Sequence, residues 1–292
     1  MLQPLTQPSP SGRGIPGFSL WQQYGILKIG VVVMTRPKVY QTEAIVLNRH
    51  RFGEADQLLV LFTPYRGKLK AVAKGALRPK SKLGGHLEPL CHSLLMLAEG
   101  RNLDIVSQCQ TIDSFLQLRE DLWRTSCALY AAELVDHFSM ENQENYPLYK
   151  LLLNTLERLC QACPPQGGHI VLRYFELHFL NYTGYRPELH VCLSCQQPLE
   201  PVPNYFSASG GGVLCPECRH SQALAQPLSV NALKVLRHFQ QNTYSKASRL
   251  RLDPQLQAEL ERLMRSYISY LLEYKIKSAS WMDRLSKQLP TT

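Results

Sequence analysis

The chain has 292 residues, of which 45% are hydrophobic and 19% charged, a composition typical of a globular protein long enough for two domains. No apolar run approaches the roughly 20 residues that a bilayer-spanning helix needs, so the sequence predicts no transmembrane helix and no membrane partner. The formal net charge is +9 and the pI is about 9.1, which favours an acidic partner, nucleic acid before anionic membrane.

The first 25 residues are rich in Pro, Gly, Ser and Gln, and they lack the features of a secretory signal. We expect residues 1–33 to be a disordered leader and Met34 to be the translation start. Residues 34–114 carry twelve Lys/Arg against seven Asp/Glu, whereas residues 115–292 carry eighteen against sixteen. The positive charge therefore belongs mainly to residues 34–114, which we expect to form the first domain.

The period-two alternation of β-strands dominates this first region. Strands are predicted at Thr42–Asn48, Gln57–Thr63, Lys68–Lys74, Pro89–Leu97 and Leu103–Ile112. Turn signals separate them: Phe52-Gly53, Pro64 with Gly67, the loop from Gly75 to Gly85, and Glu99-Gly100. Five short strands in so small a region suit a closed barrel, and the oligonucleotide-binding (OB) fold is the leading candidate.

The segment from Tyr65 to Gly85 is strongly basic and contains no carboxylate. Its apolar residues alternate with lysines, which predicts a strand with one buried and one solvated face, followed by a basic loop. A phosphate-binding surface is the functional interpretation, and a solvated strand face with its loop is the alternative. The predicted DNA-binding residues are Arg66, Lys68, Lys70, Lys74, Arg78, Lys80 and Lys82.

Helical periodicity begins after Asp113, and residues 115–292 are predicted to form an all-α domain. Helices are expected near Phe115–Leu134, at Tyr146–Cys163, Ile170–Tyr182, Val230–Gln241 and Gln255–Lys277. Ser229 and Asp253 are predicted N-caps, and Gly184 a C-cap. An irregular segment rich in Cys, Pro and Gly lies at about residues 187–227.

Four cysteines of that segment have the spacing of a zinc site. Cys192-x2-Cys195 is followed by Cys215-x2-Cys218, and four thiolates would close a tetrahedral, structural site. Nine cysteines in a long chain favour a reducing cytosol over disulfides. His190 and His220 could replace a thiolate, although a surface position suits each better. Cys160-x2-Cys163 lacks a second pair, and Cys91 and Cys109 are expected in the barrel core.

The chain resembles the RecO family of bacterial recombination mediators from about Thr42 to Lys277. The resemblance rests first on Gly53-Glu54-x-Asp56, Phe62-Thr63, Gly67-Lys68, Ala73-Lys74-Gly75 and Lys80-Ser81, which stand in family order. It continues in SFLQLREDL at Ser114–Leu122, in RYFELHFLNYTGYRPELHVCLSC at Arg173–Cys195 and in FSASGGGVLCPEC at Phe206–Cys218. The leader and the Cys160/Cys163 pair depart from the family pattern.

The resemblance implies an α+β multidomain protein: an N-terminal OB-fold barrel, then a helical domain that carries a zinc element. It also implies a cytoplasmic, nucleoid-associated protein that is not an enzyme. Such a protein binds single- and double-stranded DNA, anneals complementary strands, and works with RecR to load RecA onto DNA coated by single-strand-binding protein (SSB).

Two functional hypotheses follow. In the first, the seven cations bind DNA phosphates, and Phe52 or Tyr65 stacks on bases, with Phe62 a weaker candidate. If all seven cations met single-strand phosphates, log K against log salt would have a slope of about −5. In the second, the chain is a zinc-containing interaction scaffold whose helical domain docks RecR or the acidic C-terminal tail of SSB. Its cations near apolar helix faces are Arg124, Lys234, Arg237, Lys246, Arg249 and Arg251.

Overall fold

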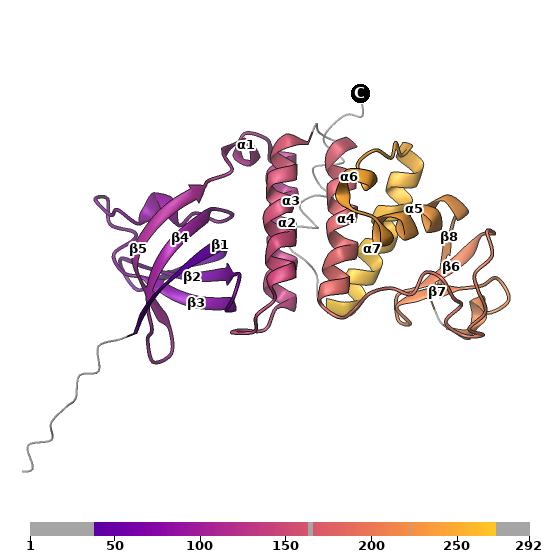
Figure 1. Ribbon diagram of the computed structural model, residues 1–292, viewed down its shortest axis with the longest axis horizontal. Helices are drawn as coiled ribbons and strands as arrows, with labels where there is room; N and C mark the ends of the chain where they lie inside the picture. The colour runs from indigo at the N-terminus through magenta and orange to yellow at the C-terminus, as the bar shows by residue number, and fades with distance from the viewer. Residues whose placement is uncertain (1–37, 163–165, 223, 273–292) are drawn as a thin grey trace, which may run out of the picture. The chain divides into compact units, whose positions relative to one another are not determined.

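Five strands at the start of the described chain close into a barrel in the computed structural model, which describes residues 38–162, 166–222 and 224–272 (Figure 1). The strands are β1 (Val39–Phe52), β2 (Asp56–Thr63), β3 (Gly67–Ala73), β4 (His92–Ala98) and β5 (Asp104–Asp113). Their order is β1-β2-β3-β5-β4, and β4 pairs back onto β1. The β3–β5 pair is parallel and the other pairs are antiparallel. All five predicted strands are thus present.

Strand β1 runs further than the sequence predicts. A shift in register between Val46 and Asn48 marks a bulge, after which β1 continues pairing with β2 as far as Phe52. A bulge bends a strand without ending its pairing, and alternation of side chains is lost across it. The predicted end at Asn48 was therefore four residues too early.

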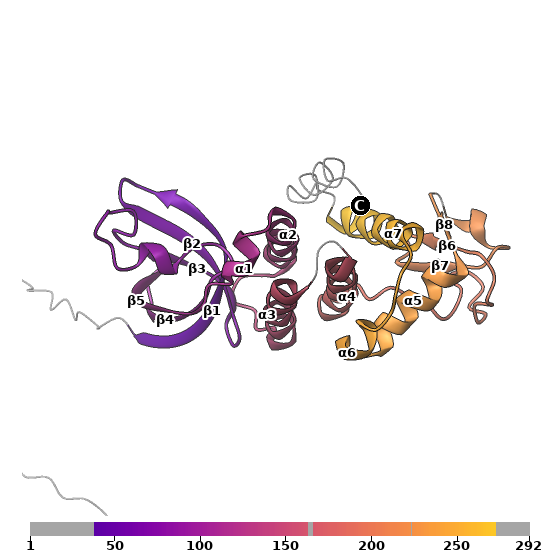
Figure 2. The same ribbon diagram turned by 90° about the horizontal axis from the view of Figure 1, so that it is seen from above.

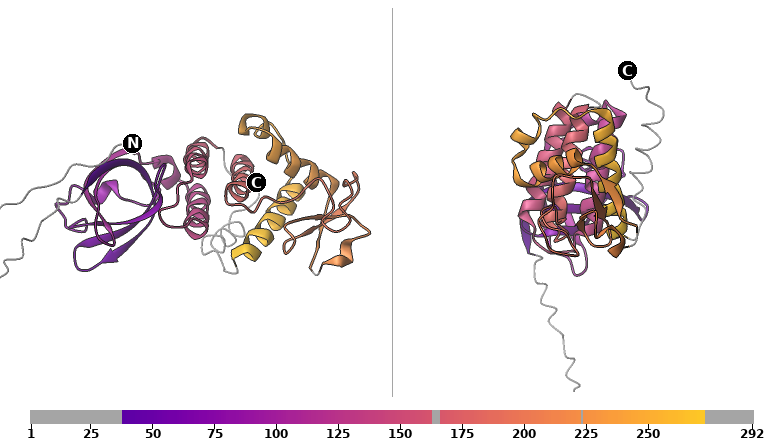
Figure 3. Two further views of the ribbon diagram at one scale, coloured as in Figure 1. Left: turned by 60° about the horizontal axis from the view of Figure 1, so that its bottom comes forward. Right: turned by 90° about the vertical axis from the view of Figure 1, so that its right-hand side faces the viewer.

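The barrel has two apolar faces. The left view of Figure 3 looks into the barrel. Its interior is filled by a separate cluster that includes Leu59, Leu61, Leu69 and Leu95. On the outside, Ile45, Leu47, Val60 and Phe62 join a second cluster that continues through the helices. Helices and barrel therefore share one core, and the described residues from 38 to 272 belong to a single compact unit.

The helices begin and end largely where capping residues predict. They are α1 (Leu116–Arg119), α2 (Leu122–Phe138), α3 (Tyr146–Gln161), α4 (Gln166–Tyr182), α5 (Val230–Gln241), α6 (Tyr244–Ala247) and α7 (Pro254–Leu272). Ser229 and Asp253 accept hydrogen bonds from Ala232 N and Leu256 N, which confirms both as N-caps. Viewed from above, α2 and α3 lie side by side next to the barrel (Figure 2).

The helix predicted from Phe115 is divided into α1 and α2. Phe115, with a positive φ of 47°, precedes α1, and Asp121, in an extended conformation, caps α2. The irregular segment also holds more structure than predicted. Three short strands, β6 (Asn204–Ser207), β7 (Gly212–Leu214) and β8 (Gln226–Leu228), form a sheet in the order β7-β6-β8. The region after residue 114 is therefore not all-α.

Some predictions lie outside the described residues: the leader and Met34, Cys163 with the prolines after it, and residues 273–277 of the last predicted helix. No helix within the described ranges is both long and apolar enough to cross a membrane.

Candidate functional site

The basic stretch forms β3 and the loop that follows it, and its seven cations fall into two groups. We call Arg66, Lys68 and Lys70 the strand cations, and Lys74, Arg78, Lys80 and Lys82 the loop cations. As the sequence predicts, Leu69, Ala71 and Ala73 are buried between them. The two groups differ in their carboxylate partners.

Each strand cation has an acidic partner. Arg66 Nη2 lies 2.8 Å from Glu99 Oε1, and its guanidinium lies 3.7 Å from the centre of the Tyr40 ring. The hydrogen bond to Glu99 raises the pKa of Arg66 above its ordinary value. The Arg66 side chain is therefore held by Glu99 and Tyr40, although it remains 40% exposed.

The other two strand cations meet the last turn of α2 and the loop that follows it. Lys68 Nζ lies 3.3 Å from Asp136 Oδ1, and Lys70 Nζ lies 2.5 Å from Glu141 Oε1. The Lys68 side chain is only 14% exposed, whereas that of Lys70 is 42% exposed. Lys68 is therefore part of the packed barrel–helix boundary, and Lys70 lies at its rim.

Backbone contacts hold that loop against β3. Asn142 N donates to Lys68 O over 2.7 Å. Gly67 has a φ of +62°, and a Cβ atom there would lie 1.8 Å from Gln143 O, so only glycine allows the loop to approach. The family motif Gly67-Lys68 is thus explained by this contact.

The loop cations are exposed and, within the described residues, lie near no carboxylate at ion-pair distance. Their loop is nevertheless ordered by the turn between β1 and β2. Leu77 N donates to Ala55 O over 2.9 Å, and Gly75 N donates to Asp56 Oδ1 over 2.7 Å. The start of the loop is thus held beside that turn, and its four cations are exposed.

The three aromatic residues predicted to stack on bases differ in their exposure. Phe62 is fully buried and belongs to the core, whereas Phe52 is 46% and Tyr65 69% exposed. Phe52 ends β1 next to the turn that holds the basic loop. Its neighbour Arg51 is exposed and was not predicted as a site residue. The basic sequence Asn48-Arg-His-Arg-Phe52 could have revealed it, had β1 been extended through its bulge.

The four predicted metal ligands come together at the small sheet. Among the described residues, Cys192, Cys195, Cys215 and Cys218 form a group whose Sγ atoms all lie within 4.8 Å of one another. Cys192 precedes a tight turn in which Gln196 N donates back to Cys192 O. Cys215 follows β7, and Cys218 N donates to Cys215 O in a matching turn. Each CxxC turn therefore delivers two thiols to one point.

The distances suit a metal. Four sulfurs around a zinc ion with bonds of about 2.3 Å are spaced roughly 3.8 Å apart, and Cys195 Sγ lies 3.9 Å from Cys215 Sγ. Burial tends to raise the pKa of Cys192, but N–H groups of Cys215, Cys195 and Ser194 outweigh it and lower the pKa to about 6. The donor set consists of soft sulfurs, which suit zinc.

Neither flanking histidine joins the group. His190 Nε2 contacts the amide of Gln241, and His220 Nε2 accepts from Arg219. Cys91 is buried, as predicted, while Cys109 is half-buried against the barrel interior.

Two cations predicted to dock a partner have structural contacts instead. Arg124 donates to the backbone oxygens of Cys160 and Ala162 at the end of α3. Arg237 of α5 donates to Leu189 O, just before the first cysteine pair. The other four cations of that predicted set are exposed: Lys234, Lys246, Arg249 and Arg251.

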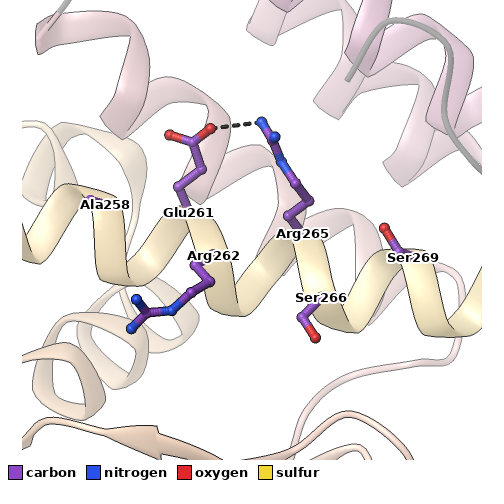
Figure 4. Close-up of a pocket in the computed structure, with 6 residues that line it drawn as sticks. All are labelled: Ala258, Glu261, Arg262, Arg265, Ser266 and Ser269. Atoms are coloured by element: carbon purple, nitrogen blue, oxygen red, sulfur yellow. Dashed lines mark hydrogen bonds and ion pairs between the residues drawn. The ribbon is translucent and has the colours of Figure 1, made fainter. Parts of the chain in front are cut away.

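A hollow of about 400 Å³ lies along α7, where Glu261 and Arg265 pair across one helical turn at 2.7 Å (Figure 4). Within α4, the buried Arg173 and Glu176 pair at 2.8 Å. Burial raises the pKa of Glu176 to about 7, although Arg173 opposes the shift. Arg173 and Glu176 thus form a buried ion pair within α4.

Comparison with known proteins assigns a family to this arrangement. The model of the Recombination protein O N terminal matches residues 34–115, and that of the Recombination protein O C terminal matches residues 119–280. The DNA repair protein RecO of Dehalococcoides mccartyi strain CBDB1 is 42% identical over 252 residues, covering 86% of this chain and 98% of that protein.

The DNA repair protein RecO of Roseiflexus sp. strain RS-1 is also 42% identical, over 88% of this chain and 89% of its own length. That of Desulforamulus reducens is 34% identical over 86% and 96%. The resemblance noted in the motifs is thereby confirmed over most of the chain. The chain belongs to the RecO family of DNA repair and recombination proteins.

Proposed function

We propose that this chain is a non-enzymatic recombination mediator that binds single- and double-stranded DNA and anneals complementary strands. The supporting observation is the ordered cluster of loop cations, which project from a closed five-stranded barrel and lack carboxylate partners among the described residues. The strand order fits an OB fold, in which the turn between the first two strands contributes to the ligand surface. Here that turn anchors the basic loop.

In this mechanism the loop cations neutralise phosphates, so that two strands can approach each other despite their charge. Binding of this kind is independent of sequence, because phosphates carry no base information. If the four loop cations each met a single-strand phosphate, log K against log salt would have a slope of about −3. We assign DNA binding to residues 34–114, with Arg51 and Phe52 beside the loop, and partner binding to residues 115–292.

We assign a structural zinc ion to the cysteine quartet. The convergence of four thiols on one point supports it, since a closed four-thiolate site leaves no position for substrate. The ion would tie the two CxxC turns together. Its ligands would be Cys192, Cys195, Cys215 and Cys218, and its role would be to stabilise the small sheet.

The helical region would act in the cytoplasm with RecR, help load RecA, and dock the acidic tail of SSB. The exposed cations of α5, α6 and the segment after α6 favour an acidic peptide. The competing function is an interaction scaffold whose DNA binding is incidental. Replacing Lys246 and Arg249 by Glu in the full chain separates peptide binding from DNA binding. Peptide binding should fall while DNA binding persists.

The decisive experiment is a strand-annealing assay of zinc-quantified full-length protein, with and without SSB, across a salt series. We expect faster annealing than the spontaneous reaction, weakening as salt rises, and one zinc per chain. Absence of annealing on naked DNA at low salt would refute the proposed activity.

A Cys215→Ser variant tests the zinc assignment separately. It should lose zinc and become more sensitive to proteolysis around residues 187–227, and the Cys109→Ser variant serves as a control with an unrelated thiol. Full metal retention by Cys215→Ser would contradict the ligand set.

A further inference from the structure

A cavity of about 430 Å³ lies between the outer face of β1, the turn after β2 and the start of α3. The cavity lies away from the basic loop. Residues near the start of β1 line the cavity, whereas Phe52, at the far end of β1, lies near the basic loop. Its volume is within the range of small-molecule sites. Its lining combines aromatic rings, one cation and one carboxylate, which together define a ligand.

Two tyrosines form one wall. The rings of Tyr65 and Tyr146 are stacked at 5.7 Å between centroids with an interplanar angle of 12°. Tyr65 nevertheless remains 69% exposed, so its ring is supported from one side and open on the other. An exposed aromatic platform held in place by a second ring is suited to stacking with a flat ligand.

The floor is polar and fixed. Glu43 Oε2 accepts hydrogen bonds from His92 Nε2 over 3.1 Å and from the Tyr149 hydroxyl over 3.2 Å. The second carboxylate oxygen, Oε1, has no hydrogen-bond partner among the described residues, and the Glu43 side chain is 47% exposed. The cavity therefore offers an oriented acceptor to an N–H donor.

The rim is positive. Lys150 lines the cavity, with its ammonium 5.9 Å from the centre of the Tyr146 ring. A cation here favours a ligand that carries an anionic group and disfavours an arginine side chain, which could otherwise stack on Tyr65 and pair with Glu43. A flat ring with an exocyclic amino group and an attached phosphate meets all three conditions.

We propose that this cavity holds one unpaired nucleobase of a single strand. The base stacks on Tyr65, its amino group donates to Glu43, and its phosphate lies near Lys150. Adenine, cytosine and guanine carry an amino group and thymine does not, so the site prefers the first three. A paired base cannot enter, and the site therefore distinguishes single strands from duplex. The inference rests on the proposed DNA binding and adds a second contact to it.

The test compares Tyr65→Ala with Tyr65→Phe in the full chain, with Tyr182→Ala as a control outside the cavity. Tyr182 is 38% exposed, as Tyr146 is. Affinity for a fluorescent single-stranded oligonucleotide should fall about tenfold in Tyr65→Ala. Tyr65→Phe and Tyr182→Ala should bind as the parent does, and affinity for duplex should be the same in all four proteins.

A second readout concerns base identity. The parent should prefer oligo-dC to oligo-dT, and Glu43→Gln should reduce that preference. An equal loss of duplex affinity in Tyr65→Ala, or no loss for either substrate, would overturn the inference while leaving the proposed function intact. If the parent protein bound neither substrate, the proposed function itself would fail.

Discussion

The strand cations and the loop cations belong to one basic stretch, yet their surroundings differ. Arg66, Lys68 and Lys70 each meet a carboxylate from a distant part of the chain, at Glu99, Asp136 and Glu141. The loop cations have no such partner among the described residues. Positive charge on a strand can therefore serve to join the barrel to its neighbours, while the same charge in the next loop remains available to a ligand.

Charge reversal in the loop should have the largest effect. The double variant Lys80→Glu, Lys82→Glu replaces two free cations with anions, and single-strand affinity at physiological salt should fall by roughly ten- to a hundredfold for all sequences alike. Fluorescence anisotropy measures it. The double variant Lys246→Glu, Arg249→Glu makes the same change in charge on exposed residues outside the barrel, so it is the matched control and should change little. Unaltered binding would remove the loop from the proposed interface.

Removal of Lys68 should mainly affect stability. Lys68→Ala leaves Asp136 and its backbone oxygen without their partner at a partly buried position, so the free energy of unfolding should fall by about 1–3 kcal/mol. Lys70→Ala removes an exposed pair and should cost less than about 1 kcal/mol. Urea titrations of both variants compare them directly. Equal losses of unfolding free energy would mean that the deeper burial of Lys68 does not make its ion pair more stabilising than that of Lys70.

Freeing the strand cations should steepen the salt dependence. In the double variant Glu99→Gln, Glu141→Gln, both Arg66 and Lys70 lose an anionic partner. If both then reach phosphate, the slope for single strands should change from about −3 to about −4. Binding isotherms at several salt concentrations give the slope. A constant slope would show that these cations lie away from the DNA even when unpaired.

The smallest expected effect depends on pH. A hydrogen bond from Lys70 holds the pKa of Glu141 below its ordinary value, so the folded state binds this proton less readily than the unfolded state. The stabilisation is therefore complete above the unfolded pKa and is lost as pH falls through the lower folded value. Because both side chains are well exposed, Glu141→Gln should differ from the parent by less than about 1 kcal/mol at neutral pH and converge with it in acid.

Local patterns predicted much of the molecule. Alternation located all five barrel strands, and side-chain caps located the starts of α5 and α7, because both signals lie within a few residues of their effect. The sheet at β6, β7 and β8 was missed, since strands of three or four residues are too short to show a period. The cysteine spacing predicted the quartet without it.

Long-range contacts could not be predicted in the same way. Nothing near Lys68 in the sequence points to Asp136, which lies on a helix that follows the whole barrel. Likewise the stacking of Tyr65 on Tyr146 depends on how α3 packs against the barrel. The basic run was visible in the sequence, but which of its charges are neutralised depends on the tertiary fold.

The core that the barrel shares with the helices has a practical consequence for the expression of protein fragments. Ile45, Leu47, Val60 and Phe62 point out of the barrel and are covered by helices that the C-terminal family model contains. A fragment that stops near residue 115 would leave this apolar surface in water, where it would promote aggregation. We therefore expect the barrel to be less stable alone than within the intact chain, although the N-terminal family model covers it as a separate unit.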